Sequence, residues 1–426
     1  MSDALRSVLE YPLLNAIFGR RARRFGLGMR IPSGPLAFTS RHASVPLSEL
    51  ERILLLAVGA GVSGWSFGVS YGPDRPDEHG HYSVRFTGCT ALTAGGFGTL
   101  AMLFADDGGT FLTDTCDVTS ERMREFEGIE DDAERLMAVV RAQTVKLSGG
   151  RLELPAAPPH MLEPNLWMAN APGSTVFMPI ADASESVLAL MAMVLAIGNV
   201  IVDDAVGCPA GDLEPFIRGG VLSAAEKRVP LSVLQQVSCG SNCSDAVFMA
   251  HNVVLTMQAM GLGGLCFAGL NRWSVLGAFA GDGIQGFGFR FQRDERWTLP
   301  NPVGLDGYFE GMCPPYYADM RAAVAVFVER EFAAGGTYAP AASGPWKGTA
   351  AVRSSVVRYD DAFVDCLGEV AQYVFDTFGR FPGSFTTVAL PGFVQAVHLD
   401  TAFYDAHYCE GAYSDTHAEH MRRWHG

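Results

Sequence analysis

Apolar residues recur at helical spacing in several stretches of the chain. The spacing predicts a helix over residues 5–24 and another over residues 46–58. Ser44 or Ser48 can cap the second helix, and Glu51 lies where a carboxylate favours the positive end of a helix. Further helices are expected from spacing or composition at residues 131–143, 184–202, 245–260, 316–332 and 360–378.

Short runs with strand character lie between these helices. The apolar run at residues 98–105 ends in turn residues and resumes at residues 110–114, which predicts a β-hairpin. Other strands are expected at residues 82–86, 174–180 and 265–268. Long helices mixed with scattered short strands predict a layered α+β fold.

Composition and charge narrow the class of protein. The chain has 426 residues, of which 48% are hydrophobic and 18% are charged, so it can bury a large core. The formal net charge is −15, and an acidic chain lacks the basic surplus that binds nucleic acid. The most apolar stretch, residues 187–202, is shorter than the ~20 residues that cross a bilayer, so no membrane segment is expected. The absence of a signal-peptide pattern and of a CxxC pair among nine cysteines favours a cytoplasmic protein with reduced thiols.

Four arginines stand close together at the end of the first predicted helix, in Arg20-Arg21-Ala22-Arg23-Arg24-Phe25. Such a cluster is ordinary on a solvated surface. Closely spaced guanidinium groups nevertheless repel one another unless an anion neutralises them, and arginine can hold a phosphate through two parallel hydrogen bonds. The cluster is therefore a candidate phosphate site.

Two glycine-rich segments are candidates for close approach to a flat ligand. The first, residues 89–98, leads into the predicted hairpin, and the second, residues 261–264, closes the helix at 245–260. A β-turn and a helix cap explain them equally well. The first segment is not a GxGxxG motif before a helix, so a doubly wound dinucleotide-binding fold is not expected.

In this order, the motifs resemble the nitroreductase-like superfamily of FMN-dependent oxidoreductases, over about residues 10–275. Members often begin with an apolar helix that ends in Arg-x-Ser-x-Arg-x-Phe. Here Arg20 and Arg23 fall on the arginine positions, and Arg21 or Ala22 replaces the serine. The closest branch is that of the thiazole- and oxazole-forming dehydrogenases, whose later motifs are similar to Pro46-Leu47-Ser48, Leu92-Thr93-Ala94-Gly95-Gly96 and Gly261-Leu262-Gly263.

The resemblance implies a nitroreductase-like layered α+β fold, with a central mixed or antiparallel sheet flanked by helices and a C-terminal extension. Residues 1–295 would form the flavin-binding domain, and residues 296–426 a helical, aromatic and His-rich extension packed on it. It further implies a homodimer, for which the buried helix at residues 187–202 is a candidate interface. The expected function is two-electron hydride transfer through FMN with a small organic substrate, and NAD(P)H is a candidate electron donor.

All three motifs contribute predicted cofactor-binding residues. The arginines would supply positive charge at the phosphate, the first glycine segment backbone donors, and the second glycine segment the border of the ring. These residues are Arg20, Arg21, Arg23, Thr93, Ala94, Gly95, Gly96, Gly261, Leu262, Gly263 and Gly264. No metal ligand is assigned in this interpretation.

The C-terminal tail supplies the candidate catalytic residues. Half of the ten histidines lie in the last 29 residues. If the tail folds over the flavin, Tyr404, His407 or Tyr408 can give or take a proton.

Two alternatives remain open at this point. His417 and His420 share a helix face, and with Asp400, Asp405 or Glu419 they could bind a metal in a metal-dependent enzyme. The changed serine positions of the motifs also suit a relative that has lost its cofactor and serves as a binding or scaffold protein.

Overall fold

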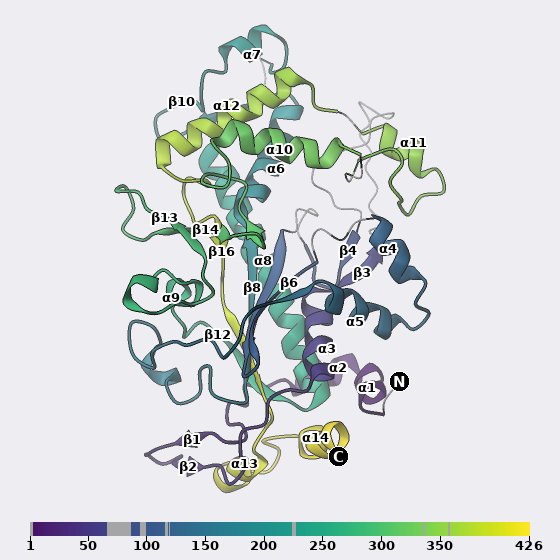
Figure 1. The fold of residues 1–426 in the computed structure, drawn as a ribbon, viewed down its shortest axis with the longest axis vertical. Helices are drawn as coiled ribbons and strands as arrows, with labels where there is room; N and C mark the ends of the chain where they lie inside the picture. The colour runs from purple at the N-terminus through teal and green to yellow at the C-terminus, as the bar shows by residue number, and fades with distance from the viewer. Residues whose placement is uncertain are drawn as a thin grey trace.

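A seven-stranded antiparallel sheet forms the centre of the computed structural model (Figure 1). The structure describes residues 3–65, 87–93, 99–115, 118, 120–223, 227–334, 336, 338–356 and 358–426. The strand order is β12-β17-β8-β5-β6-β7, and β16 also pairs with β8. The strands are β5 (Leu100–Asp106), β6 (Gly109–Asp114), β7 (Thr144–Ser148), β8 (Thr175–Asp182), β12 (Gly263–Phe267), β16 (Val388–Ala389) and β17 (Phe393–Val397).

Two helices, α3 (Glu49–Ala60) and α8 (Leu231–Met260), pack against this sheet. Leu55 of α3 and Val253 of α8 are fully buried in one apolar cluster with Phe177 of β8. Burial of apolar side chains on this scale is the main force that holds a helix on a sheet. The arrangement confirms the predicted α+β class with a central antiparallel sheet flanked by helices.

A second group of helices packs at one end of the sheet, at the top of Figure 1. The helices α6 (Ala183–Ala196), α10 (Met320–Phe332) and α12 (Asp361–Phe378) share a buried cluster that includes Leu188, Phe327 and Leu367. Nearly all of α6 is buried within this chain. The expectation that this helix forms a dimer interface is therefore wrong, because its apolar surface is already covered by the chain's own core.

The remaining elements are short or lie at the edges of these layers. The helices are α1 (Asp3–Leu9), α2 (Leu13–Gly19), α4 (Ser120–Glu127), α5 (Asp132–Ala142), α7 (Glu214–Arg218), α9 (Arg272–Leu276), α11 (Thr349–Ser354), α13 (Thr401–His407) and α14 (Asp415–His425), with 3-10 turns at Glu163–Asn165 and Ala280–Asp282. The strands are β1 (Arg30–Ile31), β2 (Phe38–Thr39), β3 (Val62–Trp65), β4 (Thr87–Cys89), β9 (Val200–Asp203), β10 (Cys208–Pro209), β11 (Arg228–Pro230), β13 (Arg290–Gln292), β14 (Asn301–Leu305) and β15 (Phe309–Glu310).

Several predicted elements are confirmed, and others differ in extent. The helix predicted at residues 184–202 ends at Ala196, and residues 200–203 form β9 instead. The predicted hairpin is β5 and β6, joined at the expected turn. The predicted helix at residues 5–24 is two short helices, because the backbone at Pro12 is extended and caps α2. Helix α8 begins well before residue 245, since polar residues of its first half such as Ser238 and Asn242 are buried through hydrogen bonds with Ser186. The expected strand at residues 82–86 lies outside the described residues.

The segment expected to be a C-terminal extension contributes to the central sheet itself. Strand β17 lies between β12 and β8, with Ala396 opposite Gly264 and Gln395 opposite Val176. The chain then continues into α13 and α14 at the lower end of Figure 1, where both termini lie. The predicted division at residue 295 into a flavin-binding domain and an extension packed on it stays a prediction.

Two further observations concern membrane-spanning helices and cysteines. Within the described residues, no helix combines the length and the apolar composition that a membrane span requires. The eight cysteines in that part of the chain are free. A cytoplasmic location stays a prediction.

Asp182 caps α6 from a buried position at the end of β8. Its Oδ1 accepts hydrogen bonds from the N–H of Ser184 at 2.8 Å and from the hydroxyl of Ser184 at 2.5 Å. Burial, together with the nearby negative charge of Glu185, raises the pKa of Asp182 to about 7. The folded chain therefore keeps a proton on Asp182 at pH values where the unfolded chain has lost it.

We predict that Asp182 makes the free energy of unfolding fall as the pH rises from about 4 to about 7, because the native state binds the additional proton in that window. Asp182→Asn keeps the Oδ1 acceptor and removes the titration. Urea denaturation across the pH range should show the variant gaining stability relative to the wild type as the pH rises, by at most about 1.4 kcal/mol per pH unit. Parallel curves for the two proteins would contradict this.

Candidate ligand-binding site

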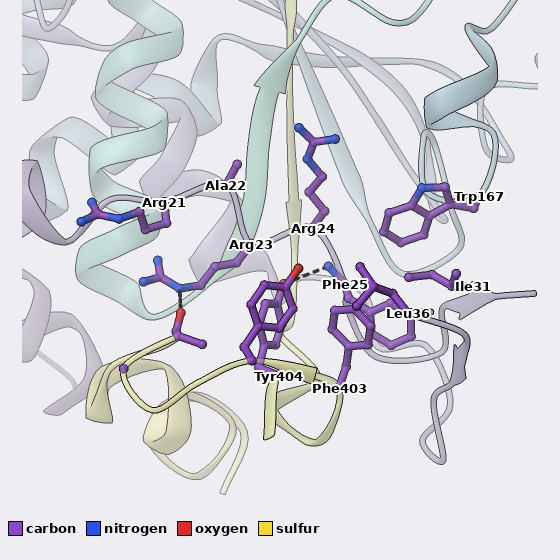
Figure 2. A pocket seen from close by; sticks show the side chains of 13 residues that line it. Arg21, Ala22, Arg23, Arg24, Phe25, Ile31, Leu36, Trp167, Phe403 and Tyr404 are labelled. Carbon is purple, nitrogen blue, oxygen red and sulfur yellow. Dashed lines mark hydrogen bonds between the residues drawn. The ribbon is translucent and has the colours of Figure 1, made fainter. Parts of the chain in front are cut away.

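One pocket brings together the arginine cluster and the C-terminal tail (Figure 2). Its volume is about 520 Å³, within the range of ~300–1,000 Å³ that is usual for small-molecule sites. It is lined by Arg21, Ala22, Arg23, Arg24, Phe25, Ile31, Leu36, Trp167, Phe403, Tyr404, Tyr408, Gly411 and Ala412.

Stacked aromatic rings form one wall of the pocket. The Phe25 ring lies 4.3 Å from that of Phe403 at 19° and 6.1 Å from that of Trp167 at 24°. Tyr404 packs edge-on against Phe403, with ring centroids 5.2 Å apart. Phe25 and Phe403 are themselves almost fully buried, so the half-buried Trp167 is the ring of this wall that a planar ligand can reach.

The phenol of Tyr404 holds the backbone under this wall. Its oxygen accepts a hydrogen bond at 3.1 Å from the N–H of Phe25 (Figure 2). Without this bond, the N–H would be buried without a partner. Burial raises the pKa of Tyr404 well above its usual range, so the hydroxyl stays protonated near neutral pH.

Arg23 is committed to acceptors of the protein. Its Nε donates to the carbonyl oxygen of Ala412 at 2.8 Å, and its Nη1 donates to Oε1 of Gln258 at 3.0 Å and to the carbonyl oxygen of Gly19 at 3.4 Å. The side chain is buried, and burial lowers its pKa from the ordinary value. Arg23 therefore ties α2, α8 and the tail together.

The neighbouring arginines are exposed. Arg21 and Arg24 line the pocket, and Nη1 of Arg21 also donates to the carbonyl oxygens of Phe18 and Arg20 at 2.8 Å. Arg20 is exposed too and lies outside the described lining of the pocket. Arg21 and Arg24 thus belong to the lining of this cavity without being buried, and Figure 2 shows their guanidinium groups pointing in different directions.

The second glycine segment lies directly beside the arginine cluster. The N–H of Gly264 donates to the carbonyl oxygen of Arg23 at 2.6 Å, and the two residues form an antiparallel bridge. A side chain at Gly261 would collide with the backbone of Thr416, and one at Gly264 with the carbonyl oxygen of Gln395. The close approach that these glycines allow is therefore made by segments of the protein.

The predicted roles of the glycine segments in binding a cofactor stay predictions. Gly261, Leu262, Gly263 and Gly264 are not among the described lining residues, and Leu262 is buried in the core between sheet and helices. Thr93 is described but does not line this pocket either, and residues 94–96 (Ala94, Gly95 and Gly96) lie outside the described residues.

The three candidate catalytic residues of the tail lie on or beside α13. Tyr404 and Tyr408 line the pocket, and Tyr408 is 51% exposed. His407 instead packs its ring against Phe38 at 5.8 Å and Phe403 at 5.0 Å, outside the described lining. The sequence did not point to Trp167 or Phe403, because single aromatic residues carry no signal of which distant ring they will meet.

The histidines considered as metal ligands separate. Nδ1 of His417 lies 2.8 Å from the Ser414 hydroxyl, and burial lowers the pKa of His417 to about 3. His420 instead faces Glu51, with its Nε2 2.8 Å from Oε1 of that carboxylate.

The carboxylates expected to complete a metal site are committed elsewhere. Asp400 caps α13, Asp405 accepts a hydrogen bond from the hydroxyl of Tyr413, and Glu419 pairs with Arg423. The expected ligand set is therefore wrong, and the carboxylate beside His420 is Glu51. Burial acts to raise the pKa of Glu51, but hydrogen bonds with His398 and His420 hold it well below its usual range.

Comparisons with known proteins find similarity among solved structures alone. No protein-family model matches the chain, and no curated protein matches it. Among solved structures, it is similar to a crystal structure described as a "putative nitroreductase" from Ralstonia eutropha JMP134, at 13% identity over 62% of this chain and 72% of that chain, with a TM-score of 0.27. A superposition with so low a TM-score says nothing about the site. Membership in the thiazole- and oxazole-forming branch stays a prediction.

Replacing Arg23 by alanine should lower the free energy of unfolding by roughly 2–4 kcal/mol, because it removes several buried hydrogen bonds of a charged donor. Arg21→Ala is the matched control, and it should change stability by less than about 0.5 kcal/mol since the side chain is exposed. Urea denaturation measures both. Equal effects of the two substitutions would show that Arg23 does not tie these segments together.

Proposed function

We propose that the protein is an FMN-dependent oxidoreductase that binds the flavin in this pocket and transfers two electrons, as hydride, to or from a small organic substrate. The observation that carries the proposal is the combination, in one cavity of about 520 Å³, of two exposed guanidinium groups with a wall of stacked aromatic rings.

The chemistry of the lining fits the two halves of FMN. A phosphate requires positive charge, and Arg21 and Arg24 can supply it while remaining hydrated. An isoalloxazine ring requires an apolar surface, which Trp167, Ile31 and Leu36 can offer. The buried rings of Phe25 and Phe403 lie behind Trp167 and hold it in place. Arg23 then acts as a positioning residue, because its hydrogen bonds hold the segment that carries the other arginines.

The residues of the chain would bind and orient the cofactor and exclude water from it. When bound, FMN supplies the capacity to accept and release two electrons. The aromatic wall would keep water from the bound ring, and Tyr404 fixes the backbone of Phe25 within that wall. The exposed Tyr408 lies at the pocket and can give a proton to a substrate or take one from it.

The partners of the reaction are part of the same proposal. NAD(P)H is the proposed electron donor, a small molecule the substrate, and a homodimer the proposed assembly. If the protein is instead a relative of the flavoenzymes that has lost FMN, it would bind an aromatic anion in the same pocket and show no electron transfer. The test therefore separates binding from redox chemistry.

Titration of FMN with the protein, followed by flavin fluorescence, tests the binding. Arg21→Ala and Arg24→Ala should each weaken FMN binding by roughly tenfold, about 1.4 kcal/mol, through loss of a phosphate contact. Riboflavin, which has no phosphate, should bind these variants as it binds the wild type. Trp167→Ala should weaken the binding of both ligands, because it removes part of the aromatic wall.

Arg41→Ala, at an exposed arginine outside the described lining, is the matched control and should leave both affinities unchanged. Failure of the wild type to bind FMN, or equal FMN binding by all variants, would contradict the proposed site. Anaerobic addition of NADPH to the FMN complex should bleach the flavin absorbance. FMN binding without reduction by any nicotinamide or substrate would favour the binding protein instead.

A further inference from the structure

Four side chains outside the pocket converge on one point. Glu51, His398, His420 and His425 each aim one potential ligand atom at a common centre, and these atoms lie within 4.8 Å of one another. From Oε1 of Glu51, the distances to Nε2 are 3.2 Å for His398, 2.8 Å for His420 and 3.3 Å for His425. We call these four residues the Glu51 cluster.

The outer nitrogens of two rings are fixed by backbone carbonyls. Nδ1 of His398 lies 2.8 Å from the carbonyl oxygen of Val45, and Nδ1 of His420 lies 2.8 Å from that of Met260. A carbonyl oxygen can only accept, so each Nδ1 must carry the proton. In the neutral rings, Nε2 then carries no proton, and its lone pair faces the centre of the cluster.

The carboxylate is oriented in the same way. Oε2 of Glu51 accepts the N–H of Ser48 at 2.6 Å in the capping box of α3, which leaves Oε1 facing the three rings. Nε2 of His398 and Nε2 of His425 lie 3.2 Å apart. Acceptor atoms this close together in a buried site repel one another unless a positive species lies among them.

We propose that the Glu51 cluster binds one divalent transition-metal ion of the Zn²⁺ class. Imidazole nitrogen and carboxylate oxygen are ligands of Zn²⁺, and the hydrogen bonds from Nδ1 to carbonyl oxygens are the usual outer contacts of metal-binding histidines. At metal–ligand distances of ~2.0–2.1 Å, tetrahedral ligand atoms lie about 3.3 Å apart. Four of the six pairs of ligand atoms already lie 2.8–3.3 Å apart, and the other pairs lie within 4.8 Å, so the side chains must close slightly to receive the ion.

The role of the ion is structural: it holds α14 in place and takes no part in catalysis. Four protein ligands fill a tetrahedral ion, which is the arrangement of structural sites, whereas catalytic zinc keeps a position open. Glu51 comes from α3, His398 follows β17, and the other two ligands lie on α14. The ion therefore joins the last helix to the first helix that packs on the central sheet.

The access to this centre and its surroundings agree with that role. The side chains of Glu51 and His398 are fully buried, and that of His425, one residue from the end of the chain, is 23% exposed. An ion can enter where His425 moves away. Beside the cluster, the ring of Trp424 stacks on that of His420 at 5.9 Å and 22°.

The test uses full-length protein without a histidine tag, stripped with a chelator and dialysed against Zn²⁺. Elemental analysis should then find one zinc per chain, and the zinc form should have a higher Tm than the stripped form, since the ion binds the folded state. Co²⁺ in place of zinc should give the visible absorption bands of a tetrahedral site. One tightly held iron or manganese per chain that depends on His425 would support the site as well.

His425→Ala removes the most exposed ligand and should leave the fold intact, as circular dichroism can verify. It and His420→Gln should weaken zinc binding by more than about 100-fold, because even outer contacts of metal ligands are worth 10–100-fold. His251→Ala on α8 and Glu49→Gln, at exposed residues outside the cluster, are matched controls and should bind zinc as the wild type does. Stripped wild type that takes up no metal, or ligand variants that bind zinc like the controls, would overturn the proposal.

Discussion

The insertion of β17 between β12 and β8 is the constraint on which the lower half of the molecule depends. Once β17 is paired on both sides, the residues after it must run beside the N-terminal segment. The N–H of Leu27 then donates to the carbonyl oxygen of His398, and the N–H of Asp400 to that of Phe25. The tail therefore forms one wall of the pocket and supplies three of the four members of the Glu51 cluster.

The same strand also positions the far side of the pocket. The Gln395 side chain accepts the N–H of Asn170 at 2.9 Å and donates to the carbonyl oxygen of Met168 at 2.7 Å. These bonds hold the loop that carries Trp167, whose ring stacks on Phe25. A single buried glutamine thus couples the sheet to the aromatic wall, and the pocket is a consequence of strand pairing rather than of a local motif.

Local features of the fold could be predicted from the sequence, and long-range ones could not. The β5–β6 hairpin is predictable because its turn and both strands are adjacent in the chain. Glu51 was recognised only for its place at the start of a helix, since its partner His398 is 347 residues away. The glycines after α8 indicated a close approach, but the sequence could not show that Thr416 and Gln395 make it. Burial likewise separates Arg23 from its exposed neighbours, although all of them look alike in the sequence.

The proposed flavin site can be tested most directly by a crystal structure of the protein grown with FMN. We expect electron density for the ring against Trp167, in front of Phe25 and Phe403, with the phosphate beside Arg21 and Arg24. Density for FMN at another place in the chain, or an ordered pocket without FMN at saturating concentration, would contradict it.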